Sequence, residues 1–169
     1  MKRENPTWKA FAATKIVDLD TLLQTLSPLR EKGKKIATIN GSFDLLHAGH
    51  LHILYEASQQ ADVLIVALNT DASIKRYKSP ERPIIPLQER MEMVAALTFV
   101  DFVTWFEEDD PRSLLSNLQP DVHVNGSEYG HNCIEAQTVQ EHGGRIHIVE
   151  KIPGRATSQI ISTIKTICD

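Results

Sequence analysis

The sequence predicts an α/β protein in which helices cover both faces of a parallel sheet, and two observations lead to that class. Five strand-like segments, at residues 36–39, 62–68, 102–106, 121–125 and 145–150, alternate with segments of helical spacing. The fourth is short and has only a weak pattern of its own, and the fifth alternates around Ile146 and Ile148. The second segment is apolar at every position after its first residue, which is typical of a strand buried on both faces. Alternation of strand and helix favours parallel strands joined by crossover helices.

Size and composition indicate one domain over residues 1–169. The chain is 41% hydrophobic and 24% charged, which is ordinary for a globular protein. A domain of this length buries roughly 70% of the surface of its unfolded chain. Residues 1–15 show no periodic pattern, so we expect them to form a loose N-terminal arm.

Charge and segment composition argue against several functions. Lys and Arg total 18 against 22 Asp and Glu, and no basic stripe supports nucleic-acid binding. No apolar segment approaches the roughly 20 residues of a membrane span. The polar start lacks the apolar core of a signal peptide, and two distant cysteines fit reduced thiols. We therefore expect a cytoplasmic protein that binds neither nucleic acid nor membrane.

Capping residues and helical spacing define the expected helices in chain order. The first, at 18–29, begins at Asp18, and the next spans 49–60. Asp71 is placed to cap a short helix, and Pro86 opens another because its missing N–H costs little there. Further helices are expected at 111–118, at 134–142 and at 157–167, where one stripe carries Ile160, Ile161, Ile164 and Ile167.

Residues 36–50 carry the strongest functional pattern in the chain. An apolar strand ends at Gly41, and a turn leads into a helix that starts near His47 and His50. Free backbone N–H groups and the helix dipole make such a turn a phosphate site. Imidazoles three residues apart lie on one helix face and can reach one anion together.

Two other interpretations of these histidines are open. They are either ordinary structural residues at a helix start or, with nearby His52, part of a zinc site. On a helix, however, His50 and His52 point in different directions. The two cysteines, Cys133 and Cys168, lack the spacing of metal ligands.

The stretch from Gly41 to His50 resembles the signature of the cytidylyltransferase-like nucleotidyltransferases, a Gly-x-Phe-Asp sequence followed by His-x-Gly-His. Within that superfamily the chain is most similar to the heptose-1-phosphate adenylyltransferases, and next to the glycerol-3-phosphate cytidylyltransferases. The likeness extends over residues 18–166. It implies a Rossmann-like, doubly wound sheet of five parallel strands.

The resemblance also implies a reaction. AMP would pass from ATP to a sugar 1-phosphate, of which D-glycero-D-manno-heptose 1-phosphate is the expected example, with release of pyrophosphate. Mg²⁺ should arrive with the triphosphate, held mainly by phosphate oxygens and water, and no protein residue is assigned to a metal. A homodimer is implied as well.

The resemblance assigns roles to three sets of residues. The catalytic set is His47, His50 and Lys78. The nucleotide-binding set is Gly41, Ser42, Phe43, His47, His50, Gly126, Arg155, Thr157 and Ser158. The substrate-binding set is Asp44, Lys75, Arg90 and Asn125.

Several of these positions have an ordinary alternative. Lys78 is equally read as a solvated surface charge, and Thr157 with Ser158 as a simple helix cap. For the acidic run at 107–110, we favour a solvated helix start over the alternative of a metal site.

At two positions the chain differs from the sequence pattern of the family that it resembles. Ala156 replaces the first hydroxyl of a Ser-Thr-Thr run, and Asn125 replaces a lysine. The loss of a fixed positive charge leaves two alternatives open beside the adenylyltransferase. One is a cytidylyltransferase that makes CDP-glycerol or another CDP-alcohol or CDP-sugar. The other is a catalytically silent nucleotide-binding module.

Overall fold

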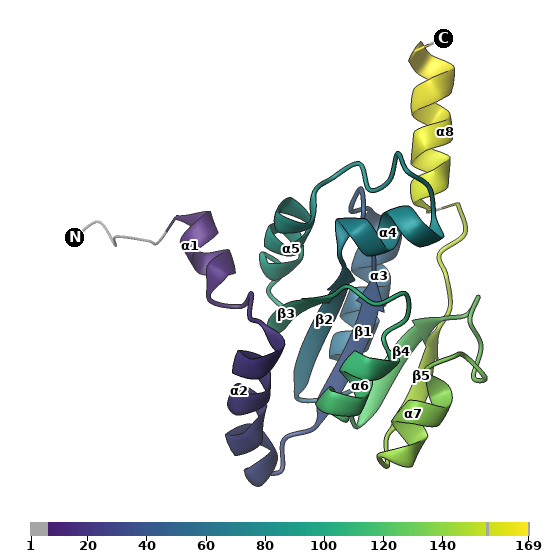
Figure 1. Ribbon diagram of the computed structural model, residues 1–169. Coiled ribbons are helices and arrows are strands. Elements are labelled where there is room, and N and C mark those ends of the chain that lie inside the picture. The colour runs from purple at the N-terminus through teal and green to yellow at the C-terminus, as the bar shows by residue number, and fades with distance from the viewer. Residues whose placement is uncertain (1–6, 155, 169) are drawn as a thin grey trace.

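The computed structural model describes residues 7–154 and 156–168, and it contains one five-stranded parallel sheet (Figure 1). The strands lie in the order β3-β2-β1-β4-β5. Their bounds are β1 Ile36–Gly41, β2 Val63–Asn69, β3 Phe102–Phe106, β4 Val122–Gly126 and β5 Arg145–Val149. The predicted class, a Rossmann-like parallel sheet flanked by helices, is confirmed.

Helices cover both faces of this sheet. In the described residues they are α1 Trp8–Ala13, α2 Leu19–Glu31, α3 Ala48–Ser58, α4 Asp71–Tyr77, α5 Leu87–Ala95, α6 Arg112–Leu118, α7 Ala136–Glu141 and α8 Thr157–Cys168. One apolar cluster joins α3 and α5 to the sheet, and a second joins α2 and α6 to the opposite face. All seven residues of β2 are buried, as its unbroken apolar sequence predicts.

The N-terminal region differs from the expected loose arm. Trp8–Ala13 is a helix whose Thr7 side chain accepts a hydrogen bond from the Ala10 amide, and Ala12 is completely buried. Lys15 Nζ then donates to the carbonyls of Leu97 and Val100, at 2.9 and 2.7 Å. These long-range contacts fix a segment whose own sequence has no helical periodicity. The expectation was therefore wrong for the described part of this region.

Two other details depart from expectation. Asp18 caps α2 as predicted, but the cap of α4 is Thr70, whose hydroxyl accepts from the Ser73 amide, and Asp71 is the first helical residue. No residue of α8 is buried, and this helix extends away from the sheet (Figure 1). Within the described residues no helix is both long and apolar enough to cross a membrane.

The strand order places a topological switch between β1 and β4. The chain passes from β1 to β2 to β3 on one side, and then crosses to β4 and β5 on the other. Loops that leave β1 and β4 therefore diverge above their carboxyl ends, where open parallel sheets bind ligands.

Candidate functional site

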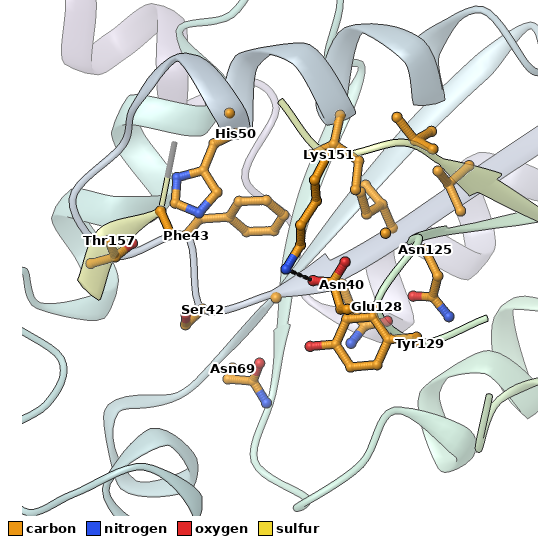
Figure 2. Close-up of a pocket in the computed structure, with 18 of the residues that line it drawn as sticks. Asn40, Ser42, Phe43, His50, Asn69, Asn125, Glu128, Tyr129, Lys151 and Thr157 are labelled. Carbon is orange, nitrogen blue, oxygen red and sulfur yellow. Dashed lines mark ion pairs between the residues drawn. The ribbon is translucent and has the colours of Figure 1, made fainter. Parts of the chain in front are cut away.

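A cavity of about 500 Å³ lies above the carboxyl ends of the strands, at the switch between β1 and β4 (Figure 2). Its walls come from the loop after β1, from the start of α3, from the end of α4 and from the segments that follow β4 and β5. Segments far apart in sequence thus meet at the carboxyl ends of the strands. The cavity is large enough to hold a nucleotide.

The loop between β1 and α3 has an unusual backbone. Phe43 and Leu45 both have positive φ angles, of 44° and 52°, which side-chain-bearing residues rarely adopt. Asp44 between them is completely buried and accepts hydrogen bonds from Arg82 Nε at 2.7 Å and from the amides of Ile84 and Ile85. Burial alone would raise the pKa of Asp44, but the two amides and Arg82 together lower it. The ionised carboxylate holds the strained loop in place.

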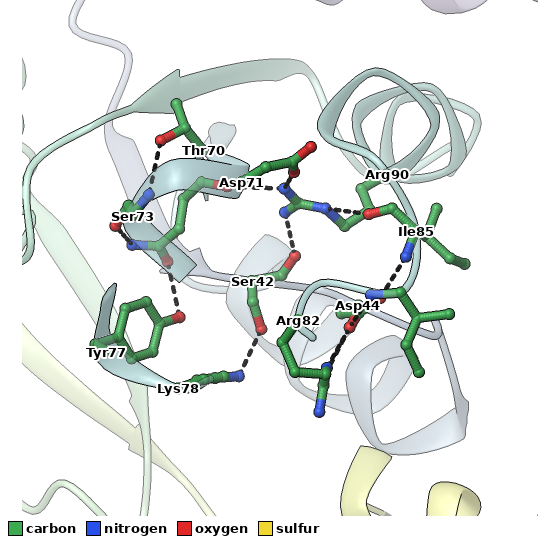
Figure 3. A network of polar contacts seen from close by, with 12 residues as sticks. Ser42, Asp44, Thr70, Asp71, Ser73, Tyr77, Lys78, Arg82, Ile85 and Arg90 are labelled. Atoms are coloured by element: carbon green, nitrogen blue, oxygen red, sulfur yellow. Dashed lines mark hydrogen bonds and ion pairs between the residues drawn. The ribbon is translucent and has the colours of Figure 1, made fainter. Parts of the chain in front are cut away.

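Arg90 holds the same loop from beneath (Figure 3). This completely buried guanidinium donates to the carbonyls of Ile85, Ser42 and Asn69, and pairs with Asp71 at 2.7 Å. It therefore ties the ends of β1 and β2 to the starts of α4 and α5. Asp44 and Arg90 were predicted to bind substrate, yet neither side chain is accessible from the cavity. Both instead position the loop.

The two signature histidines lie against each other at the start of α3. Their ring centroids are 3.8 Å apart, with 22° between the ring planes. His47 Nδ1 accepts from the Gly49 amide at 3.1 Å, which leaves the ring proton on Nε2. His50 Nδ1 is buried and has no hydrogen-bond partner among the described residues.

Both histidines are neutral at physiological pH. Burial lowers the pKa of His47, and burial together with repulsion from His47 and Lys78 lowers the pKa of His50 to about 4. Neutral imidazoles can donate a hydrogen bond without carrying a charge into the site. In the described part of the chain, no group of three His, Cys, Asp or Glu side chains is placed to bind a metal, which gives the zinc alternative no support.

Lys78 supplies positive charge to the cavity. Its Nζ donates to Ser42 Oγ at 2.9 Å. Burial is the main cause that lowers the pKa of Lys78, and repulsion from Arg82 lowers it further. Lys75, predicted to bind substrate, is exposed and does not line the cavity. The acidic run contributes Asp109 and Asp110 to the edge of the cavity, but these pair with Arg76 and Arg112.

The start of α8 closes the same end of the cavity. Thr157 Oγ1 donates to the carbonyl of Asp44 at 3.0 Å, which links the start of α8 to the signature loop 113 residues earlier in the chain. Ala156 and Thr157 line the cavity, whereas Ser158 is exposed and does not. Arg155, predicted to bind nucleotide, lies outside the described residues.

Sequence reasoning missed several residues on the β4 and β5 side. Asn125 and Gly126 line the cavity as expected, and Glu128, Tyr129, Glu135 and Lys151 join them. Lys151 and Glu128 form an ion pair of 2.6 Å across this side (Figure 2). The available signal was position: these residues follow the carboxyl ends of β4 and β5, where site residues of parallel sheets gather.

Comparisons with known proteins agree with this geometry. A family model described as cytidylyltransferase-like matches residues 38–167. The bifunctional protein HldE of Citrifermentans bemidjiense is 40% identical over 152 residues, which are 89% of this chain and 31% of that protein. HldE of Geotalea uraniireducens is 42% identical over 153 residues, 90% of this chain and 31% of that protein. The chain thus spans about a third of the length of these relatives.

Solved structures lead to the same fold. The lipopolysaccharide core biosynthesis protein from Thermoplasma volcanium superposes with a TM-score of 0.57 at 25% identity, covering 70% of this chain and 97% of that one. A pantoate-beta-alanine ligase from Francisella tularensis, at 16% identity and a TM-score of 0.57, shares the fold alone. The family model covers most of the chain, and its match includes the histidine loop at the switch point. The chain belongs to the cytidylyltransferase-like family.

Proposed function

We propose that this chain is a nucleotidyltransferase domain that transfers AMP from ATP to a sugar 1-phosphate of the heptose class. Family membership supports nucleotidyl transfer, and the relatives named HldE support the heptose class of acceptor. The observation that carries the proposal is the stacked pair of neutral imidazoles on a strained loop, at a helix start above the sheet's switch point.

The reaction requires no covalent enzyme intermediate. An oxygen of the acceptor's phosphate attacks the α-phosphorus of the triphosphate, and the bond from that phosphorus to the bridging oxygen of the β-phosphate breaks. Pyrophosphate leaves with the electron pair. Because both reactants are anions, catalysis depends on positioning and on stabilisation of the charge that builds on the α-phosphate oxygens.

The loop residues suit that task. The Nε2 proton of His47 and one ring proton of His50 are donors for the α-phosphate, and their rings are fixed by each other and by the Gly49 amide. Lys78 adds a positive charge beside Ser42. Thr157 gives its hydroxyl hydrogen to the Asp44 carbonyl and so fixes the start of α8 beside the loop, where the free backbone N–H groups of the helix N-terminus favour phosphate oxygens. Donors fixed before the reaction need no reorganisation during it.

Magnesium would enter with the nucleotide. The described residues offer no group of three acidic, histidine or cysteine ligands for it, and the two aspartates that line the cavity, Asp109 and Asp110, are paired with arginines. Phosphate oxygens and water would therefore hold most of its coordination sphere, and its charge would offset that of the triphosphate.

Pyrophosphate release tests the proposal directly. Purified protein with Mg²⁺ is mixed with ATP or CTP and with heptose 1-phosphate, mannose 1-phosphate or glycerol 3-phosphate. Release with ATP and heptose 1-phosphate is expected. Release only with CTP and glycerol 3-phosphate would establish the cytidylyltransferase instead, and nucleotide binding without any release would establish the silent module.

A further inference from the structure

A buried carboxylate without a cationic partner lines the cavity on the side of β4. Glu135, just before α7, and Asn125, near the end of β4, are each only 6% exposed, and both line the cavity. Asn125 Nδ2 donates to Glu135 Oε2 at 3.4 Å, which is a long hydrogen bond. Within the described part of the chain, Glu135 belongs to no ion pair.

This carboxylate has unused capacity to accept hydrogen bonds. An ionised carboxylate offers about four acceptor positions, and the long Asn125 bond together with the neighbouring Cys133 thiol, a weak donor, leaves others free. Burying such a group without donors is costly, so its place in a ligand cavity calls for donors from the ligand.

An acceptor without any partner among the described residues faces the same region. Asn40 lines the cavity, and its Oδ1 atom is buried without a hydrogen-bond partner among the described residues. Thr38 Oγ1 and His123 Nδ1 are 2.8 Å apart, so positions 38 and 123 share one face of the sheet. Side chains alternate along strands, which places Asn40 and Asn125 on that same face. Asn40 and Asn125 therefore line the same side of the cavity (Figure 2), and Glu135 is bonded to Asn125 there.

The charge distribution decides which part of a ligand lies there. Lys78, the two histidines and Thr157 gather at the loop end of the cavity. On the β4 side Lys151 is paired with Glu128, and Glu135 is negative and repels phosphate. A phosphorylated ligand therefore keeps its phosphates at the histidines. The group beside Glu135 is uncharged and donates hydrogen bonds.

We propose that Asn125 and Glu135, with Asn40 beside them, form a recognition pair for hydroxyl or amino donors on the uncharged part of the ligand. The inference rests on the proposed function for the presence of a nucleotide and a phosphorylated sugar in the cavity. Three sources supply such donors: the hydroxyls of the nucleotide ribose, the exocyclic amino group of the base and the hydroxyls of the acceptor sugar. The carboxylate makes Glu135 a determinant of which ligand is accepted.

The test compares Glu135→Gln with Glu141→Gln. Gln keeps the size of the side chain but removes the charge and one acceptor oxygen. Glu141 is an exposed residue at the other end of α7, so its substitution makes the same charge change outside the cavity. Calorimetry measures binding of ATP, 2′-deoxy-ATP and ITP, and pyrophosphate release measures KM for heptose 1-phosphate.

We expect Glu135→Gln to weaken the binding of one of these ligands by about 10- to 100-fold, as a lower affinity or a higher KM. Glu141→Gln should change none of these affinities or KM values by more than about twofold. A loss of affinity for ATP but not for 2′-deoxy-ATP shows that the pair contacts the ribose hydroxyl. A loss of affinity for ATP but not for ITP shows that the pair contacts the amino group of the base. A higher KM for heptose 1-phosphate with unchanged nucleotide affinity assigns it to the acceptor sugar.

Two controls separate this inference from the proposed function and from folding. A wild type that releases pyrophosphate, beside a folded Glu135→Gln variant with unchanged affinities and KM, would overturn the recognition pair alone. Nucleotide binding that is weakened in Glu135→Gln, with no pyrophosphate release by the wild type, would overturn the transfer reaction and support the pair. If Glu135→Gln fails to fold, Asn125→Leu removes the other member, and an unchanged ligand profile in that variant would also overturn the pair.

Discussion

Replacing Arg90 by Met should loosen the signature loop and destabilise the whole fold. The guanidinium is completely buried and donates to three backbone carbonyls and to Asp71. The side chain of Asp71 is 38% exposed, so water can solvate it after the substitution. The three carbonyls lose their donor in a partly or fully buried place, at about 1–2 kcal/mol each. We expect unfolding to become easier by about 3–5 kcal/mol, which corresponds to a fall in Tm of roughly 10 °C.

Urea unfolding followed by circular dichroism measures this loss, with Arg145→Met as the matched control. Arg145 is exposed and contacts Gln60 at 3.2 Å at the opposite end of the sheet, so its replacement should cost less than about 1 kcal/mol. Arg90→Met should also weaken ATP binding, because Ser42 and the histidines lose their support. A stability change below about 1 kcal/mol with unchanged ATP affinity would refute the positioning role of Arg90.

Four further predictions use the histidines, position 125 and the assembly. His50→Ala should lower kcat and kcat/KM together by about 100- to 1000-fold while ATP affinity stays nearly constant, and His50→Asn should recover part of the loss; an unchanged kcat in steady-state assays would make His50 structural. The folded-state pKa values of His50 and His123, about 4 and about 3, lie below the ordinary value, so the unfolded chain binds protons first as pH falls. Urea unfolding at pH 7, 5.5 and 4.5 should therefore show stability that is complete above pH 6.5 and declines toward pH 4, and a flat profile would contradict neutral burial. Asn125→Lys should place an ammonium beside the Glu135 carboxylate and change acceptor use; kinetic constants that stay the same for every acceptor would show that position 125 does not contact the acceptor. The homodimer implied by family resemblance stays a prediction, and a monomer mass in light scattering at micromolar protein would refute it.

The middle of the sheet was predictable from sequence because β2 is an unbroken apolar run, the mark of burial on both faces. The edge strand β5 is largely not buried and was recognised by its alternation around Ile146 and Ile148. The predicted strand bounds at 102–106 match β3, and the others differ by one or two residues. Helix α1 was missed because it is six residues long and only Ala12 is buried, so its formation depends on contacts elsewhere in the fold.

The histidine loop was also predictable, because its strand, turn and helix start are contiguous in sequence. Arg90 and Asp44 were placed in the cavity by family likeness, whereas their bonding partners lie up to 48 residues away and bury them. Glu135 was missed for a related reason. Its partner Asn125 belongs to a different element, and only the packing of α7 against β5 and α6 brings it to the cavity wall.

The most direct test of the central claim is ³¹P NMR of the wild type with ATP, Mg²⁺ and heptose 1-phosphate, beside His50→Ala under the same conditions. Transfer of AMP predicts that the signals of ATP and the sugar phosphate decline together. Those of pyrophosphate and a new sugar nucleotide diphosphate should rise in equal amounts, and the variant should lag by about 100-fold or more. Unchanged spectra in a wild type that binds ATP, or release of inorganic phosphate without the sugar nucleotide, would contradict nucleotidyl transfer.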